Sequence, residues 1–286
     1  KQDIKMLKNN HKSLTLIVAL VGLLYSCTQK KQMNTTSDKI NKEYQLIWED
    51  NFNQEKLDTT KWNRQVEPAG RFNKEWQRYT ASEKNSYIEN NQLVLKAIHE
   101  SDVHAENEYT SARLNTAGKF DFTYGKVVAK IKLPSGKAIW PAFWMLGANI
   151  DENGGDTPWP VTGEIDILEL WGTDSASVVE ANVHYADASG KHTQMGAKGY
   201  HLPKGNFSED FHEFEFEWTK ESMIWKVDGK SYHTLAITDA KYYAFHKDFF
   251  LLLNIAVGGE IAGYPDETTP LPQKMIVDWI KVYQKK

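Results

Sequence analysis

The feature that most constrains the fold of this chain is a series of short aromatic and β-branched runs, several of which alternate apolar and polar residues. They recur between clusters of Gly, Asn, Asp and Pro at 86–98, 124–133, 179–185, 211–218, 223–227, 249–257 and 275–283. A period of two is typical of a strand with one buried face. Asp228-Gly229, between two runs, favours a tight hairpin. With no long amphipathic helix and no internal repeat, we expect one all-β domain of two stacked antiparallel sheets, with a barrel as the alternative.

The N-terminal segment has the pattern of an export signal. Basic residues precede an apolar run over 14–24, which is too short to span a membrane and ends just before Cys27, the single cysteine of the chain. Leu-Tyr-Ser-Cys resembles a bacterial lipobox, and a cleaved signal peptide with an accidental cysteine is the alternative. We expect a lipoprotein signal peptide over 1–27, a polar flexible tether over 28–43 and one folded domain over 44–286. The protein would then be an exported lipoprotein at the outer membrane or cell surface, in contact with the membrane only through the lipid anchor at Cys27.

Composition and charge exclude some functions. The net charge of −4 gives no basic field, so we expect no nucleic-acid partner. A single cysteine excludes a disulfide within the chain and a thiolate metal cluster. The 10 Trp, 13 Tyr and 12 Phe are typical of sugar-stacking surfaces, but aromatic residues also fill cores.

The segment 163–170, Gly-Glu-Ile-Asp-Ile-Leu-Glu-Leu, carries the candidate chemistry. On a strand Glu164 and Asp166 share a face, whereas the odd spacing from Glu164 to Glu169 places Glu169 on the opposite one. Ile167 and Leu168 are two apolar residues where alternation allows one. A one-residue β-bulge at this point would restore the register and bring Glu169 to the carboxylate face.

Three carboxylates on one face repel each other, so folding alone does not favour them. Their proximity raises at least one pKa and leaves a protonated acid beside an ionised carboxylate. Glycoside hydrolysis needs this pair, one group to protonate the leaving oxygen and one to attack. The alternatives are a calcium site, a solvated strand face and a protein that binds sugar without cutting it.

Glu-x-Asp-x-x-Glu on a bulged strand resembles the motif of glycoside hydrolase family 16, and within it the bacterial laminarinases, which are endo-1,3-β-glucanases. The resemblance extends over nearly the whole chain after the tether, through the segments 48–53, 75–79, 109–113, 140–147, 159–160, 254–259 and 277–283. It implies a two-sheet concanavalin-type jelly-roll sandwich with a catalytic cleft on the concave face. It also implies that 44–286 is a glycoside hydrolase domain.

The resemblance also implies roles for individual residues. Glu164 would be the nucleophile, Glu169 the general acid/base, and Asp166 the residue that holds and tunes the nucleophile. The residues expected to bind substrate in the cleft are Arg113, Trp140, Trp144, Trp159 and His184, with His184 near Glu169. The implied activity is retaining hydrolysis of β-1,3-glucan by a monomer, and mixed-linkage glucan is a further candidate substrate. Agarase or carrageenase activity, transglycosylation and glycan binding without catalysis are the alternatives.

No cofactor is expected for catalysis, but the family implies a structural calcium ion away from the acids. Its ligands would come from Asn51, Asn91 and Asp278. Asn51 has no charge to offer, and Asn91 stands where the family has a turn glycine. A second departure from the family is that Val128 and Lys130 replace Glu and Arg, which alters either a cleft contact or a supporting ion pair.

Overall fold

A computed structural model describes residues 43–172, 176–196 and 198–286. Leu46–Tyr283 form one compact unit, and the described residues outside it are 43–45 and 284–286. The expected signal peptide over 1–27, the lipidated Cys27 and all but the last residue of the expected tether over 28–43 lie outside the described residues and stay predictions. Where the chain is described, no helix has the length and apolar character needed to cross a bilayer.

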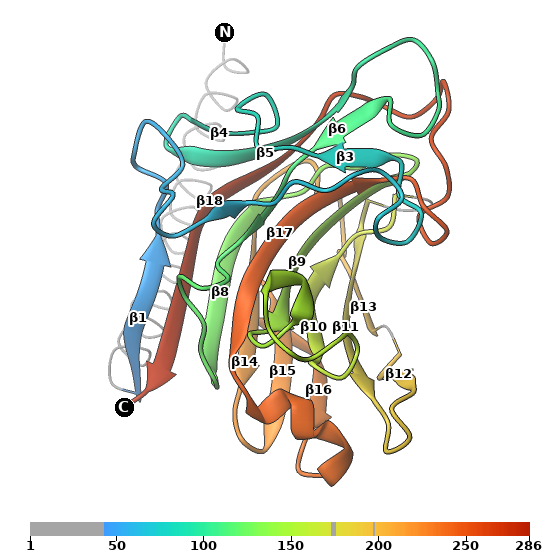
Figure 1. Cartoon of the computed structure of the whole chain (residues 1–286). Coiled ribbons are helices and arrows are strands. Elements are labelled where there is room, and N and C mark those ends of the chain that lie inside the picture. Colours follow the sequence, from blue (N-terminus) through green and yellow to red (C-terminus); the bar gives the residue numbers. More distant parts are fainter. Residues whose placement is uncertain (1–42, 173–175, 197) are drawn as a thin grey trace, which may run out of the picture. The chain divides into compact units, whose positions relative to one another are not determined.

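Nearly all regular structure in the described ranges is β-strand, arranged in two sheets (Figure 1). The first has ten strands within those ranges, in the order β16-β15-β14-β8-β18-β5-β6-β3, with β1 paired to β18 and β4 to β5. Their bounds are β1 (Tyr44–Asp50), β3 (Gln77–Tyr79), β4 (Ser86–Glu89), β5 (Gln92–His99), β6 (Tyr109–Ser111), β8 (Gly125–Lys132), β14 (His212–Trp218), β15 (Ser222–Val227), β16 (Lys230–Ala236) and β18 (Gln273–Lys285).

The second sheet has eight strands among the described residues, in the order β12-β11-β10-β9-β17-β7-β2, with β13 paired to β11. Their bounds are β2 (Asn63–Arg64), β7 (Arg113–Asn115), β9 (Ile139–Gly147), β10 (Glu164–Glu169), β11 (Val178–Ala186), β12 (His192–Gln194), β13 (Lys198–His201) and β17 (Phe249–Val257). Among the described residues, two short 3₁₀ helices lie in the connections between strands, η1 (Asp151–Asn153) between β9 and β10 and η2 (Ala240–His246) between β16 and β17.

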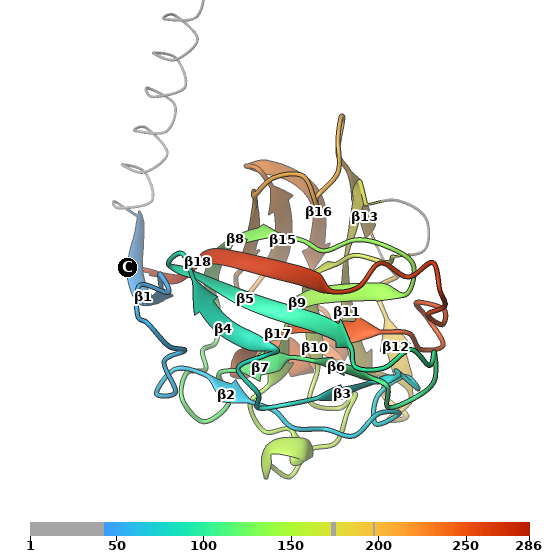
Figure 2. The ribbon, with the colours of Figure 1, turned by 90° about the horizontal axis from the view of Figure 1, so that it is seen from above.

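The hydrophobic core lies between the two sheets, which form separate layers in Figures 1 and 2. β8 supplies Val127, Ala129 and Ile131 from one sheet, and β10 supplies Ile165 and Leu168 from the other, all fully buried. Alternation along each strand therefore leaves the opposite side chains on the outer faces. The expected two-sheet all-β sandwich is confirmed.

Two hairpins follow the turn chemistry of the sequence. Asp228 and Gly229 have φ angles of 49° and 75° between β15 and β16, and Asn90 and Asn91 have 55° and 58° between β4 and β5. Positive φ at both central residues is typical of the turn that matches the twist of paired strands. The Asp-Gly prediction is confirmed, and Asn91 adopts the left-handed conformation that its position requires.

Candidate active site

The predicted β-bulge is present in β10. Against β11, Asp166 pairs with Asn182 and Glu169 with Glu180, so two residues of β10 face one residue of β11. Against β9 the irregularity lies between Asp166 and Leu168. The extra residue lets Ile167 and Leu168 both point into the core and returns Glu169 to the face that carries Glu164 and Asp166.

All eight expected catalytic and cleft residues line one cavity of about 1180 Å³ on the outer face of the eight-stranded sheet. Trp140, Ala142 and Trp144 alternate along β9 and lie beside the acids, because Glu169 pairs with Ala142 and Asp166 with Trp144. Sheet register therefore brings the acids and the two tryptophans to the same surface. Trp159 lies before β10 and is 44% exposed, so its ring is open to a ligand.

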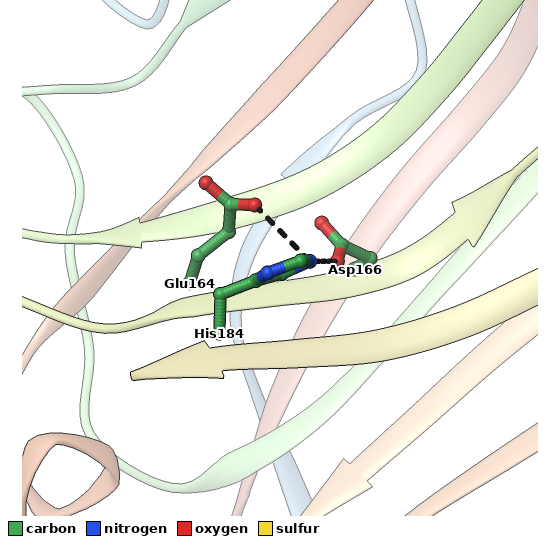
Figure 3. A group of neighbouring side chains, drawn as sticks. All are labelled: Glu164, Asp166 and His184. Atoms are coloured by element: carbon green, nitrogen blue, oxygen red, sulfur yellow. Dashed lines mark ion pairs between the residues drawn. The ribbon is translucent and has the colours of Figure 1, made fainter. Parts of the chain in front are cut away.

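Glu164 and Asp166 share contacts with His184, which pairs with Glu164 across β10 and β11 (Figure 3). The His184 Nε2 atom lies 3.7 Å from Glu164 Oε1 and 3.3 Å from Asp166 Oδ2. The indole Nε1 of Trp159 donates to Glu164 Oε2 at 3.1 Å. His184 was expected near Glu169, but its ion pairs in the structure are with Glu164 and Asp166.

Glu169 has a different environment from Glu164. It is 8% exposed, and its Oε1 atom accepts a hydrogen bond of 3.0 Å from the indole Nε1 of Trp140. The Trp140 ring packs against Trp171 with centroids 4.5 Å apart. Trp171 in turn donates to Glu180 Oε2 at 2.9 Å. The acid/base candidate is thus enclosed by aromatic rings, while Glu164 faces a histidine.

Burial and mutual repulsion raise the pKa of both glutamates. Burial followed by the charge of Asp166 raises the pKa of Glu164 to about 8, against the charges of His184 and Arg113 and the Trp159 hydrogen bond. Burial, with the charges of Asp166, Glu164 and Glu180, raises the pKa of Glu169 well above its usual range, against the Trp140 hydrogen bond.

This asymmetry assigns the protons. Two positive groups favour an ionised Glu164, whereas a further negative group opposes ionisation of Glu169. Neighbouring carboxyls whose environments separate their pKa values are the arrangement of an acid beside a nucleophile. The charges therefore favour ionisation of Glu164 before that of Glu169, which keeps its proton.

The far side of the cavity is held by a polar network around Trp144. Its Nε1 atom donates to Asn254 Oδ1 at 2.7 Å, and Asn254 Nδ2 donates to the Tyr79 hydroxyl at 3.0 Å. Tyr79 donates to Glu75 Oε2 at 3.2 Å. The Arg113 guanidinium lies 4.7 Å from the Trp144 ring centroid. The network fixes the plane that Trp144 presents to the cavity.

Arg113 was expected to bind substrate in the cleft. Its Nε donates to Gln65 Oε1 at 2.8 Å and its Nη2 to Glu152 Oε1 at 3.0 Å, and the side chain is 5% exposed. The guanidinium is thus fixed in the cavity wall by the protein itself, with Phe72 on its face at 4.5 Å.

Several wall residues were not anticipated from the sequence. All of them lie outside the acid strand β10, and they are Phe72, Glu152, Trp171, Glu180, Asn182, His192 and Gln194. Phe72 and Glu152 lie in connections, and His192 lies on the short edge strand β12, where no periodic pattern marks them. Asn182 offered a signal, since the segment Asn-Val-His-Tyr that contains it and His184 follows the acid strand.

One group in the cavity has the spacing of metal ligands. Glu164, Asp166 and His184 each bring one ligand atom within 4.8 Å of the others. These atoms already form histidine–carboxylate ion pairs, which neutralise charge without a metal. The geometry alone therefore does not call for a metal at the acids.

The residues expected to bind calcium do not fit that ion. The Lys130 ammonium lies 3.0 Å from Asp278 Oδ2, and Gln92 Nε2 donates to Asp278 Oδ1 at 3.2 Å. Both partners are hydrogen-bond donors, and a cation already neutralises the one carboxylate in the expected set of Asn51, Asn91 and Asp278. The departure at Lys130 thus forms an ion pair on the outer face of the ten-stranded sheet, not a cleft contact.

Comparison with known proteins agrees with this geometry. Residues 70–281 match the family described as Glycosyl hydrolases family 16. The chain is 33% identical over 265 residues to Glucan endo-1,3-beta-glucosidase A1 of Niallia circulans, covering 84% of the chain but 38% of that protein. It is 35% identical to the Beta-glucanase of Rhodothermus marinus over 93% of both. The catalytic domain of an endo-1,3-beta-glucanase (laminarinase) from Thermotoga petrophila superposes with a TM-score of 0.74 at 42% identity, covering 85% of this chain and 98% of that domain.

Proposed function

The chain belongs to glycosyl hydrolase family 16, and from that membership we propose that it is a retaining endo-β-glucanase acting on β-1,3-glucan. The observation that carries the proposal is the bulge in β10, which places Glu164 and Glu169 on one face of the cavity, with cationic neighbours acting on Glu164 and a further carboxylate acting on Glu169. A pair of closely placed carboxyl groups, one protonated and one ionised, is what double displacement requires.

In the first step Glu169 would donate its proton to the glycosidic oxygen while a Glu164 oxygen attacks the anomeric carbon. The carbon–oxygen bond to the leaving sugar breaks and a glycosyl ester with Glu164 forms. In the second step the ionised Glu169 would take a proton from water, which attacks the same carbon and releases Glu164. Two inversions retain the configuration, and no cofactor enters either step.

Asp166 and His184 would tune the nucleophile. His184 lowers the pKa of Glu164, whereas the charge of Asp166 raises it. The negative charge of Asp166 destabilises the Glu164 carboxylate and so makes it a stronger nucleophile. His184 partly offsets this repulsion, so that Glu164 can still ionise. Their balance sets how much of Glu164 is ionised at a given pH.

The substrate class is supported by the cavity wall and by the relatives. Trp140, Trp144 and Trp159 line the cavity, and flat aromatic rings suit the apolar faces of sugars. The three compared proteins are named glucan endo-1,3-beta-glucosidase, beta-glucanase and endo-1,3-beta-glucanase. These observations favour glucan over agarose or carrageenan, and the presence of both glutamates favours catalysis over glycan binding alone.

A substrate panel tests the proposal. Purified protein would be incubated with laminarin, lichenan, agarose and carrageenan, and the products sized by chromatography. We expect laminarin to give short oligosaccharides of mixed length, as an internal cut produces. Longer products than the starting chains would reveal transglycosylation. Rapid cleavage of agarose or carrageenan with intact laminarin would overturn the substrate, and no cleavage beside measurable laminarin binding would overturn the activity.

A further inference from the structure

His192 lies outside the catalytic acids but is joined to them through His184. The Nε2 atom of His192 is 2.9 Å from His184 Nδ1. The two ring planes differ by 15° and their centroids are 5.2 Å apart. Nearly parallel rings at this separation place the hydrogen bond close to both ring planes, which is the favourable direction for imidazole nitrogens.

The same residue packs against the other side chain that contacts Glu164. The His192 ring lies 4.6 Å from the Trp159 ring, and Trp159 Nε1 donates to Glu164 Oε2 at 3.1 Å. Trp159 is 44% exposed, and its ring centroid lies 6.2 Å from that of His184. His192 is therefore the neighbour that the two partners of Glu164 have in common.

The hydrogen positions follow from the neighbours of His184. Asn182 Nδ2 lies 3.1 Å from His184 Nε2 and can donate to it only while Nε2 carries no proton, so the proton of neutral His184 is on Nδ1. Nε2 also lies 3.3 Å from Asp166 Oδ2 and 3.7 Å from Glu164 Oε1, and these carboxylates attract a second proton to it. That proton makes His184 a cation, and in both forms His192 Nε2 is the acceptor of the Nδ1 proton.

We propose that His192 is a positioning residue that accepts the Nδ1 proton of His184 and packs on Trp159, and so fixes the orientation and charge of both partners of the nucleophile. The proposal rests on Glu164 being the nucleophile of the proposed function. His192 acts through His184 and Trp159, since its contacts described above are with them and not with the acids.

The charges that face the two histidines are consistent with this direction of the hydrogen bond. Burial disfavours a charged His184, but the hydrogen bond and charge of Asp166, with the charge of Glu164, outweigh it and raise the pKa of His184. Burial and the charge of His184 lower the pKa of His192. The shared proton therefore resides on His184, and the resulting cation favours an ionised Glu164.

Three substitutions separate the acceptor from the ring. His192→Phe keeps a ring against Trp159 but removes the acceptor, His192→Gln keeps an acceptor oxygen without the ring, and His192→Ala removes both.

Losing the acceptor makes the His184 cation less stable, so the pKa of Glu164 rises and the acidic limb of kcat/KM on laminarin moves to higher pH. We expect kcat of the Phe variant to fall about tenfold and that of the Gln variant to stay within about threefold of wild type. His201→Phe, an exposed histidine on the neighbouring strand β13, is the control and should change neither.

A second readout does not depend on activity. Titration of His184 by ¹H–¹⁵N NMR in the whole protein should show a lower pKa in His192→Phe than in wild type, with the Gln variant between them. An unmoved His184 pKa together with an unmoved acidic limb would overturn the proposal, as would equal losses in the Phe and Gln variants. A wild-type protein that leaves every glucan intact would instead refute the proposed function, and the NMR titration would still decide the role of His192.

Discussion

Trp140 donates a 3.0 Å hydrogen bond to Glu169, so the acid/base candidate is oriented by a residue from the neighbouring strand β9. The donor faces a carboxyl group that is otherwise buried among aromatic and acidic side chains. Because an N–H donor stabilises the ionised form, it also limits how far the pKa of Glu169 rises.

Removing that donor should change the acid/base step. In Trp140→Phe the ring can still pack on Trp171, but Glu169 loses its hydrogen bond. We expect kcat on laminarin to fall about tenfold, the loss of one hydrogen bond to a charged group. The alkaline limb of kcat/KM should move to higher pH. Trp144→Phe is the matched control, since its N–H is bound to Asn254, and it should leave the limb in place. Equal pH profiles for wild type and Trp140→Phe would refute this role.

The acidic cluster should make stability depend on pH. Glu164 has a pKa near 4.5 when unfolded and about 8 when folded, so the native state binds the additional proton between these values. The free energy of unfolding therefore falls as pH rises through this window, by about 1.4 kcal/mol per pH unit for each additional proton. Glu164→Gln should lose part of that slope and gain on the order of 2 kcal/mol relative to wild type between pH 5 and 8. Urea unfolding at pH 5 and at pH 8 measures these free energies. The same difference in unfolding free energy between the two proteins at both pH values would contradict this account.

The network behind Trp144 should govern substrate binding more than chemistry. Tyr79→Phe removes the hydroxyl that accepts from Asn254, whose other end holds the Trp144 indole. A loosened ring should raise KM several-fold while kcat stays within about twofold, the pattern of lost uniform binding. Tyr185→Phe, a buried tyrosine of the core, controls for the loss of a hydroxyl in general. A large fall in kcat with unchanged KM would place this network in the chemical step instead.

Calcium should have no effect on stability if Lys130 is the cation beside Asp278. We expect the Tm to be the same in EDTA and in millimolar calcium chloride. A ligand that binds the folded state must raise the Tm, so an unchanged Tm means that calcium does not bind. Magnesium chloride at equal ionic strength is the control for salt. A calcium-specific rise in Tm would show that the expected site at Asn51, Asn91 and Asp278 binds the ion despite the ammonium.

The sequence predicted those features that a local pattern encodes. Two apolar residues at Ile167 and Leu168 break the strand alternation, and this break is the bulge seen against both neighbouring strands. Asp228-Gly229 forms the expected turn because few residues accept positive φ. Such features depend on a few adjacent residues and need no knowledge of tertiary structure.

Other features depend on tertiary structure and were beyond the sequence. His192 reaches the site because β12 pairs with β11, and Glu152 reaches Arg113 from η1, although neither position carries a periodic signal. Whether Lys130 faced the cleft or the outer face depended on the register of β8. Contacts of this kind are decided by how distant segments pair.

The stereochemistry of anion rescue tests the central claim most directly. Glu164→Ala leaves space beside the anomeric carbon, where azide can take the place of the missing carboxylate. With an aryl β-laminaribioside as the activated donor, ¹H NMR of the product should show the inverted α-glycosyl azide. In Glu169→Ala the glycosyl ester with Glu164 should still form, because a good leaving group needs little protonation, and azide should release the retained β-glycosyl azide. The β-azide from Glu164→Ala and the α-azide from Glu169→Ala would exchange the two roles, and near-normal laminarin hydrolysis by either variant would contradict the mechanism.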